Sequence, residues 1–389
     1  MSIRKRKWTN AKGVEQEAWV ADYFDAKGVR RLKTFAKKKD ADAFASKTDV
    51  EVREGVHVAD RDTVSIKKAG GLWIATGEGE GLERSTINQR RHHMKHHIEP
   101  FIGDTLLSKV DPRAFQDTLR AEGRSTAMVK KVLTSLSSIL TDAIERKLAT
   151  RNPVRDMRRA HKGREARTEK RQKGKIRVGV DVPAPEEIKR MIAELTDHWR
   201  PLLLTAIFTG LRSSEIRGLR WQDYDPQAST ITVHQRADEF GVIGAPKSAA
   251  GTRTIPIPSI LNTGLKEWRL KTYSRSPKEN PLGLVFVNPD GKPRSHTNII
   301  NKGLIPAMKR AGVVTADGSA KYTGLHALRH FYASWCINPK ESGGLGLPLK
   351  AVQERMGHSS VMMTADVYGH LFPRGDDGKE LDVAAALLA

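Results

Sequence analysis

The sequence predicts a multidomain α+β protein, and three observations lead to that prediction. The chain has 389 residues, too many for a single ordinary hydrophobic core. Strand-like segments come first, and helical periodicity prevails from Lys37 to about Asp156. A basic run at 151–177 then lacks the large apolar residues that a packed core needs. We expect a small N-terminal sheet-plus-helix domain, an all-α helical bundle, and a mainly α domain with a small antiparallel β-sheet. The expected boundaries are 1–60, 63–156 and 181–372 for the domains, 157–180 for a linker and 373–389 for a tail.

The charge balance points to a polyanionic partner. Lys and Arg number 67 against 45 Asp and Glu, which gives a net charge of +22. Nucleic acid is the first candidate and an anionic membrane surface the second, but no apolar run approaches the ~20 residues that span a bilayer. Met1–Lys7 leads into polar sequence, so no secretory signal is expected. The single cysteine, Cys336, excludes an internal disulfide and fits a reducing cytoplasm; we expect it to pack in a helix beside Trp335.

The N-terminal domain is predicted from two strands and a helix. Glu17–Phe24 is short and aromatic, Gly28 supplies a turn, and Val29–Phe35 alternates basic with other residues. Lys37–Glu54 follows a helical pattern. The basic strand face is either free for DNA or merely solvated, and its candidate DNA-binding residues are Arg30, Arg31 and Lys33.

The second region reads as a bundle of helices. Thr86 is a candidate cap for a helix that reaches His97 and ends at Pro100 and Gly103. Pro112 sits just inside the next helix start, and Ser125–Leu148 carries periodic apolar residues. The candidate DNA-binding residues here are Arg90, Arg91, Lys95, Lys130 and Lys131.

The run 151–177 contains twelve Lys or Arg and three acidic residues, so it either lies along phosphates or forms a solvated tether. Beyond it, a helix is expected after Pro183–Pro185, and Trp199–Phe208 reads as a buried helix. Trp221–Val233 and Thr252–Ile257 look like strands.

The C-terminal region holds residues suited to cutting a phosphodiester without a metal. That chemistry needs a nucleophile, cations for the phosphate oxygens, and an acid for the leaving oxygen. Arg212 follows a glycine after the buried helix, where its planar fork can grip a phosphate. Glu215 then orients Arg212 or caps the helix, although a surface salt bridge is the plainer explanation.

Three later segments supply further candidates. Lys247 precedes a strand and can reach into a groove as an acid. His326 and Arg329 share a helical face at i and i+3, whereas His330 falls on a different face and has a structural role. A turn at Gly357–Ser359 would aim His358 into a cleft, and Tyr368 arrives on the following helix.

In combination these residues resemble the catalytic set of the tyrosine recombinase family. The resemblance rests on the blocks TGLRSSEI, LHALRH and MGHSS…Y, together with the Lys247 segment, in that order, and it spans roughly Pro183 to Leu371. No catalytic position departs from the pattern. More weakly, 86–110 resembles the core-type DNA-binding domain of phage integrases and 1–54 their arm-type DNA-binding domain.

The resemblance implies a metal- and ATP-independent enzyme with no cofactor. Tyr368 would attack phosphorus and form a 3′-phosphotyrosyl link, stabilised by Arg212, Arg329 and His358. Lys247 would protonate the departing 5′-oxygen, with His326 assisting. The resemblance also implies that the enzyme acts on double-stranded DNA attachment sites and forms a homotetramer in the synaptic complex. An excisionase and a host DNA-bending protein would be further partners. The expected location is the cytoplasm of a bacterial host, at the nucleoid. The tail would dock on a neighbouring protomer, pack on its own domain, or stay disordered.

Other functions fit the sequence less well. A non-catalytic DNA-binding regulator would not need all six residues, and a metal-dependent nuclease would need clustered carboxylates. A type IB topoisomerase would not need two extra DNA-binding modules. The histidines at 92, 93, 96 and 97 match metal-ligand spacing, but the expected role is a basic helix against DNA, with no metal bound. The glycine-rich stretches 77–81 and 343–346 lack a phosphate-loop lysine and are expected to be loops.

Overall fold

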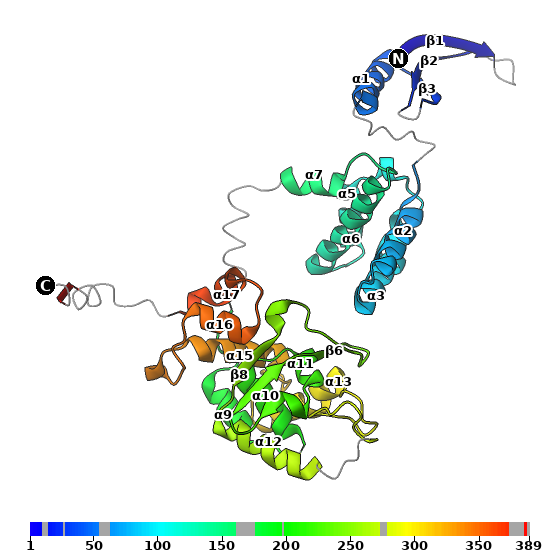
Figure 1. Ribbon diagram of the computed structural model, residues 1–389. Helices are drawn as coiled ribbons and strands as arrows, with labels where there is room; N and C mark the ends of the chain where they lie inside the picture. The colour runs from blue at the N-terminus through cyan, green and yellow to red at the C-terminus, as the bar shows by residue number, and fades with distance from the viewer. Residues whose placement is uncertain are drawn as a thin grey trace. The chain divides into compact units, whose positions relative to one another are not determined.

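The structure is a computed structural model that describes residues 1–9, 15–25, 28–53, 63–160, 176–196, 198–272, 278–372 and 385–386. Its internal contacts divide the chain into two units, Met1–Arg167 and Thr168–Ala389. Both contain elements of the predicted α+β class (Figure 1). The tail beyond Phe372 lies almost entirely outside the described residues, so its three expected states stay untested.

The first unit begins with a three-stranded antiparallel sheet and one helix. The strands β1 (Ser2–Thr9), β2 (Glu15–Phe24) and β3 (Arg30–Phe35) lie in that order, and α1 (Lys38–Arg53) packs against them. The prediction of a sheet with one helix is confirmed, but β1 was not predicted. Four of its eight residues are basic, so it shows no apolar alternation.

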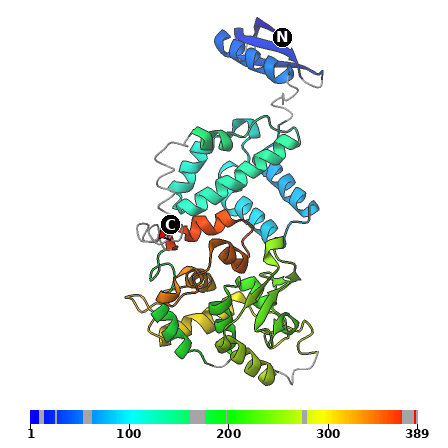
Figure 2. The same ribbon diagram turned by 60° about the vertical axis from the view of Figure 1, so that its left-hand side comes forward.

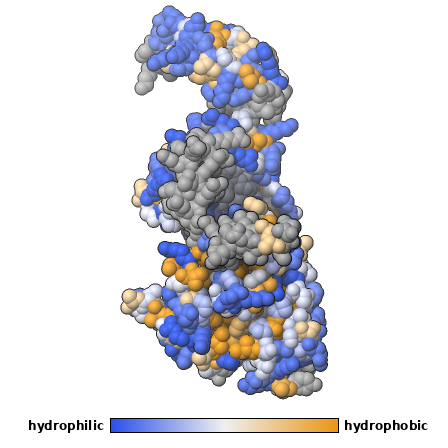
Figure 3. Space-filling view, turned by 90° about the vertical axis from the view of Figure 1, so that its left-hand side faces the viewer, coloured by the Kyte–Doolittle hydropathy of each residue, from blue (hydrophilic) through white to orange (hydrophobic). Residues whose placement is uncertain are grey.

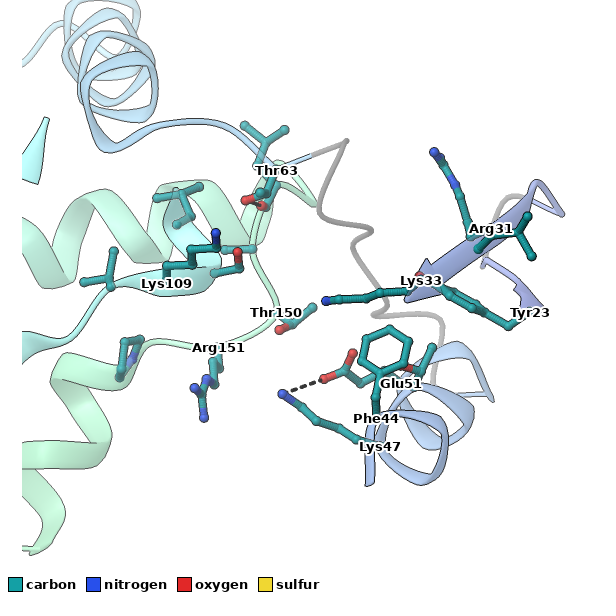
Figure 4. A pocket seen from close by; sticks show the side chains of 18 residues that line it. Tyr23, Arg31, Lys33, Phe44, Lys47, Glu51, Thr63, Lys109, Thr150 and Arg151 are labelled. Atoms are coloured by element: carbon teal, nitrogen blue, oxygen red, sulfur yellow. Dashed lines mark hydrogen bonds and ion pairs between the residues drawn. The ribbon is translucent and has the colours of Figure 1, made fainter. Parts of the chain in front are cut away.

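The helix α1 decides which face of the sheet stays open. Lys33 lies over the ring of Phe44 at 4.5 Å (Figure 4). Its neighbour on the same face, Arg31, pairs with Asp25 at 2.8 Å. Arg31 and Lys33 therefore share the face that α1 covers, and only Arg30 of the predicted basic set points to the open face. The prediction that Arg30, Arg31 and Lys33 form one free basic face on β3 was therefore wrong for Arg31 and Lys33.

The helical part of the first unit follows. The helix α2 (Ile66–Gly79) packs against the long α6 (Thr126–Glu145), where Trp73 donates its indole hydrogen to Ser138 at 3.0 Å. Asp111 caps α5 (Pro112–Ala121) and Ser125 caps α6, and Pro112 lies in the first turn of α5 as predicted. The predicted cap Thr86 was wrong, because Thr86 lies inside a helix whose N-cap is Glu83. One glycine-rich stretch is partly helical rather than a loop, because α2 continues through Gly77 to Gly79.

Of the two residues predicted to end the next helix, Gly103 does so, whereas the helix runs through Pro100. A segment of π-helix (Met94–Ile98) joins α3 (Arg84–His93) to α4 (Glu99–Ile102), and Pro100 sits in the first turn of α4, where its missing N–H matters least. The basic run also begins within the fold, since α7 (Pro153–Ala160) buries Val154 in the same core. The predicted linker, 157–180, lies mostly outside the described residues.

The second unit surrounds the buried helix α10 (Trp199–Thr209), which contacts α12 (Ser259–Thr272) and α15 (Leu325–Ile337) (Figures 1 and 2). The strands β4 (Tyr224–Asp225), β5 (Thr230–Val233) and β8 (Arg253–Pro256) form an antiparallel sheet. The predicted strand 221–233 is thus two strands, preceded by a turn of 3-10 helix and broken at 226–229. The remaining elements of the unit are α9 (Pro185–Ala193), α11 (Ser213–Gly218), β6 (Arg236–Ala237), β7 (Ile243–Gly244), α13 (His296–Asn298), α14 (Ile305–Arg310), α16 (Leu349–Met356) and α17 (Val361–Tyr368).

Candidate active site

Arg212 is placed by the sharp end of α10. Gly210 adopts a left-handed conformation with φ of 60°, and a Cβ on it would come within 2.4 Å of the Tyr332 ring. This reversal starts α11, and Glu215 in its first turn accepts hydrogen bonds from both the backbone nitrogen and the Nη1 of Arg212, each at 2.8 Å. Glu215 therefore both caps the helix and orients Arg212, whose side chain stays 38% exposed.

A second cation, Arg253 on β8, holds the same carboxylate from its other side. Its Nη2 lies 2.9 Å from Glu215 Oε2, and its Nε donates to the carbonyl of Arg355 at 2.8 Å. The side chain is only 6% exposed. Burial alone would raise the pKa of Glu215, but the hydrogen bond and charge of Arg253, with help from Arg212, hold that pKa below its usual value.

Arg253 also contacts the turn that carries His358. Gly357 ends α16 with φ of 60°, and a Cβ there would lie 2.7 Å from Arg253 Nη1. The carbonyl of Gly357 accepts from Arg212 Nη2 at 3.0 Å. One buried guanidinium thus connects β8, the start of α11 and the end of α16.

Arg329 of α15 lies deepest in the cluster, 2% exposed. Its Nη1 and Nη2 donate to the carbonyls of Gly210 and Met356, both at 2.5 Å. Burial and the nearby charge of Arg212 lower the pKa of Arg329 to about 9, so it remains charged at neutral pH. His326 lies one helical turn before Arg329, and its side chain is exposed. Partial desolvation of its ring by the surrounding protein, followed by the charges of Arg329 and Arg212, lowers its pKa.

His358 is fixed by the helix that bears the tyrosine. Its Nδ1 lies 2.8 Å from the hydroxyl of Thr364 on α17, and its backbone carbonyl accepts from Gln353. The other ring nitrogen, Nε2, is therefore the one available to a ligand. Burial, and then Arg329, lowers the pKa of His358 to about 4, so the imidazole is neutral at pH 7.

Tyr368 is the last residue of α17 and is 1% exposed. Its ring stacks on that of His358, with centroids 6.4 Å apart and planes 11° from parallel. Its hydroxyl lies 2.6 Å from Nδ1 of His330. Burial raises the pKa of Tyr368 to about 12, although the charge of Arg329 opposes the rise. The prediction that His330 has only a structural role on another face was wrong in its placement, since His330 contacts the tyrosine.

Lys247 lies at the surface on the segment between β7 and β8. That segment joins the cluster at its far end, where the carbonyl of Gly251 accepts from Arg253 Nη1 at 2.9 Å. The structure brings Arg212, Glu215, His326, Arg329, His358 and Tyr368 together and leaves Lys247 exposed on the adjoining segment. Sequence reasoning missed Arg253 and Thr364 and gave His330 the wrong placement. Thr364 and His330 each have a local signal, because Thr364 lies four residues before Tyr368 and His330 four residues after His326 on one helical face.

The predicted DNA-binding residues of the first unit divide into exposed and interior side chains. Lys95, Lys130 and Lys131 are exposed, and Arg91 is exposed beside Glu78. Arg90 is a correction: its guanidinium lies 4.2 Å from the centre of the Trp73 ring and donates to the Trp73 carbonyl at 2.6 Å. Arg90 therefore supports the helical core. The surface of the N-terminal sheet-plus-helix domain seen in Figure 3 is predominantly hydrophilic.

The histidine cluster is split in the same way. His92 and His96 are exposed, whereas His93 and His97 are buried in the helical core, so only the first pair can meet DNA. Burial lowers the pKa of both His93 and His97. Among the residues that the structure describes, no group of three or more histidine, cysteine, aspartate or glutamate side chains is arranged to hold a metal ion. No helix in the described ranges combines the length and the apolar character needed to cross a membrane.

Comparison with known proteins agrees with this arrangement. Residues 183–374 match the phage integrase family, and residues 67–160 match the phage integrase central domain. The chain belongs to the tyrosine recombinase family. Among relatives of this recombinase are an XerC-like tyrosine recombinase of Caldanaerobacter subterraneus, 26% identical with 87% of each chain covered, and the ICEBs1 integrase of Bacillus subtilis, 26% identical with 80% of each covered.

Two solved structures of similar fold are integrases in complex with DNA. The Tn1549 transposon integrase, in complex with a circular intermediate DNA, aligns with a TM-score of 0.63 at 17% identity, over 83% of this recombinase and all of that chain. A lambda integrase dimer bound to a core site aligns with a TM-score of 0.55 at 17% identity, over 92% and 93% of the two chains. At such identities these likenesses establish the fold of the recombinase.

Proposed function

We propose that this tyrosine recombinase is an integrase that cuts and rejoins DNA at specific sites through a 3′-phosphotyrosyl intermediate, with Tyr368 as the nucleophile. The observation that carries the proposal is the position of the Tyr368 ring, stacked on His358 and within the electrostatic reach of Arg329 in the same chain. A tyrosine beside fixed cations meets the two main requirements of nucleophilic phosphate chemistry.

The cluster assigns a role to each residue. Arg212 would hold a non-bridging phosphate oxygen, because its side chain is the more exposed of the two catalytic arginines and Glu215 fixes its direction. Arg329 would add a fixed positive charge from its buried position beneath the phosphate, and His358 would donate a hydrogen bond from Nε2 to a phosphate oxygen. Lys247 would protonate the departing 5′-oxygen, with His326 assisting. Integration of a phage or mobile element, and help in its excision, would follow from the exchange of such strands.

The first unit would supply DNA binding. We assign 1–60 to an arm-type domain and the helices from 63 to 160 to a core-type domain, with the remaining basic run as the linker to a catalytic domain at 181–372. The helix α7 continues to Ala160, which supports moving the linker start beyond the predicted 157. The partners would be double-stranded attachment sites and, in the synaptic complex, three further copies of this chain. An excisionase, a host DNA-bending protein and a cytoplasmic, nucleoid-associated location complete the proposal.

A trapped covalent adduct tests the proposal. Purified protein is incubated with a nicked attachment-site duplex in EDTA and resolved under denaturing conditions. Wild type is expected to form a protein–DNA adduct, and Tyr368→Phe to form none while still binding DNA. The matched control is Tyr224→Phe, because Tyr224 is another buried tyrosine of the same unit and its hydroxyl bonds only to Asn262 in the described structure.

The alternative, a non-catalytic DNA-binding regulator, makes a different prediction. It would bind the duplex tightly yet give no adduct with either the wild type or the control. An adduct that persists in Tyr368→Phe would remove the central claim, because another nucleophile would then be responsible.

A further inference from the structure

We propose that His330 is the base that receives the phenolic proton of Tyr368 when the tyrosine attacks phosphorus. This inference rests on the proposed function and assigns a residue outside the six that the sequence blocks supply. His330 would be a catalytic residue, because its ring contacts the reacting oxygen itself.

The geometry places His330 against that oxygen. Nδ1 of His330 is 2.6 Å from the Tyr368 hydroxyl, a normal distance for a hydrogen bond that involves a hydroxyl. The centroids of the two rings are 5.6 Å apart and their planes are inclined by 58°, so the rings are tilted rather than stacked. His326, one turn earlier on α15, contacts the ring of His330 at 4.4 Å, edge to face.

The direction of the hydrogen bond follows from what else the hydroxyl can reach. Tyr368 is 1% exposed, so its O–H group needs an acceptor within the protein. In the described part of the chain, the contact of that hydroxyl is with His330 Nδ1. The phenol therefore donates and Nδ1 accepts, which makes His330 a neutral imidazole with its hydrogen on Nε2.

The other two histidines of the site are less suitable. His358 lies with its ring face against the Tyr368 ring, and its Nδ1 is occupied by Thr364, so neither nitrogen is directed at the phenolic oxygen. His326 is exposed and contacts His330 rather than the tyrosine. His330 is thus the histidine in position to take the proton without rearrangement.

The step balances without any added reagent. As the Tyr368 oxygen bonds to phosphorus, its O–H bond breaks and the proton passes to Nδ1 of His330. The P–O5′ bond breaks, and the departing oxygen takes a proton from Lys247. In rejoining, a 5′-hydroxyl attacks, its proton returns to Lys247, and the proton on His330 returns to the tyrosine.

The charge of the substrate makes this transfer feasible. Burial, and then His326 and Arg329, lowers the pKa of His330 to about 4 in the protein alone. A bound phosphodiester adds a negative charge beside these cations and so favours the protonated imidazole. The acidity of the phenol also rises steeply once its oxygen begins to bond to phosphorus, so the proton moves late in the step.

The test separates proton transfer from mere positioning. His330→Asn places an amide oxygen near the position of Nδ1, so it can still accept from the tyrosine but has no usable basicity. Single-turnover cleavage is measured at saturating DNA, beside DNA binding and thermal unfolding as controls of folding. We expect His330→Asn to bind normally and cleave about 10²-fold more slowly, the contribution typical of a general base.

A second substrate distinguishes the base from the acid. In a duplex whose scissile 5′-oxygen is replaced by sulfur, the leaving thiolate needs no proton. The cleavage rate of Lys247→Ala is therefore expected to approach that of wild type on this duplex. His330→Asn is expected to stay slow on the same duplex, because the tyrosine must still lose its proton. Added imidazole should partly restore His330→Ala, which leaves a gap beside the exposed His326.

Two results would overturn the inference. One is a His330→Asn variant within about threefold of wild type, far less than the loss of a general base, which would leave His330 a positioning residue. The other is recovery of His330→Asn on the sulfur duplex. If either result is found while formation of the adduct still requires Tyr368, only the role of His330 is refuted and the proposed function stands. If the adduct forms without Tyr368, the proposed function and the role of His330 are both refuted.

Discussion

Replacing Arg253 by methionine tests whether this buried cation organises the active site. The side chain is 6% exposed and donates to both oxygens of Glu215 and to two backbone carbonyls, those of Arg355 and Gly251. Methionine fills much of the same volume but leaves the Glu215 carboxylate buried with Arg212 as its remaining cation. Breaking a buried ion pair from one side costs about 3–5 kcal/mol, and the retained Arg212 argues for the lower end.

The assay is calorimetric unfolding of the full-length protein together with single-turnover DNA cleavage. For a unit of this size, 3 kcal/mol lowers the unfolding midpoint by roughly 6–12 °C. Cleavage should fall more than DNA binding, because Arg212 and the turn at Gly357 both lose a fixed neighbour. Arg310→Met is the matched control: Arg310 and Glu194 are 3.9 Å apart and nearly half exposed, and such pairs contribute about 0–1 kcal/mol.

The double variant Glu215→Gln/Arg253→Met checks the cause. It removes the buried carboxylate that Arg253→Met alone would leave short of a cation, so the two changes should cost less together than in sum, with a coupling of about 0.5–3 kcal/mol. The reasoning fails if Arg253→Met behaves like the Arg310 control, or if the two substitutions are additive.

Three further predictions concern other parts of the chain. The pKa of His358 lies at about 4 in the folded protein, mainly because of burial, so the unfolded chain binds more protons below about pH 6.5. Stability should therefore be full above pH 6.5 and fall toward pH 4, by up to about 1.4 kcal/mol per pH unit for this group; His358→Asn should flatten the fall in urea unfolding measured at each pH. Arg6→Ala, on the open face of the N-terminal sheet, should reduce the salt dependence of DNA binding by about 0.9 in log–log slope. Lys5→Ala, on the α1 face and 2.8 Å from Glu17, should leave that slope unchanged. Deletion after Phe372 should abolish synaptic complexes in gel-shift assays yet spare binding to a single site, and unchanged synapsis would refute a docking role for the tail.

Local features of the fold were predictable because local sequence determines them. The buried helix α10, the start of α5 at Pro112, and the glycine that presents Arg212 all depend on residues within a few positions of each other. The same holds for the pairing of His326 with Arg329 on one turn of α15. Short-range periodicity and capping express these relations directly.

The contacts that complete the site join residues far apart in the chain. Arg253 and Arg355 are 102 positions apart, Arg212 and Gly357 are 145 apart, and His330 and Tyr368 are 38 apart. No periodic pattern relates such positions, so neither the role of Arg253 nor the contact of His330 with Tyr368 could be assigned from the sequence.

The N-terminal sheet shows a related limit. Alternation on β3 separates Arg31 and Lys33 from Arg30, but it does not say which face α1 will cover. That choice follows from the packing of Phe44 on Phe35 and Tyr23, which bring the helix to the Lys33 side. The open face instead carries Arg4 and Arg6 of the strand that was not predicted.

The charge balance of the cluster explains why the same residues repel one another in the absence of DNA and stabilise a bound phosphate. Three guanidinium groups, on Arg212, Arg253 and Arg329, face one carboxylate, that of Glu215, and backbone carbonyls supply most of their other partners. The surplus of positive charge helps to lower the pKa of the neighbouring histidines, so that they stay neutral and add no further repulsion. A bound phosphodiester places one negative charge beside these guanidinium groups, and the transition state of phosphoryl transfer places more negative charge on the same phosphate oxygens. The site is therefore strained without DNA and best satisfied when phosphorus is under attack, which is the condition for catalysis by differential binding.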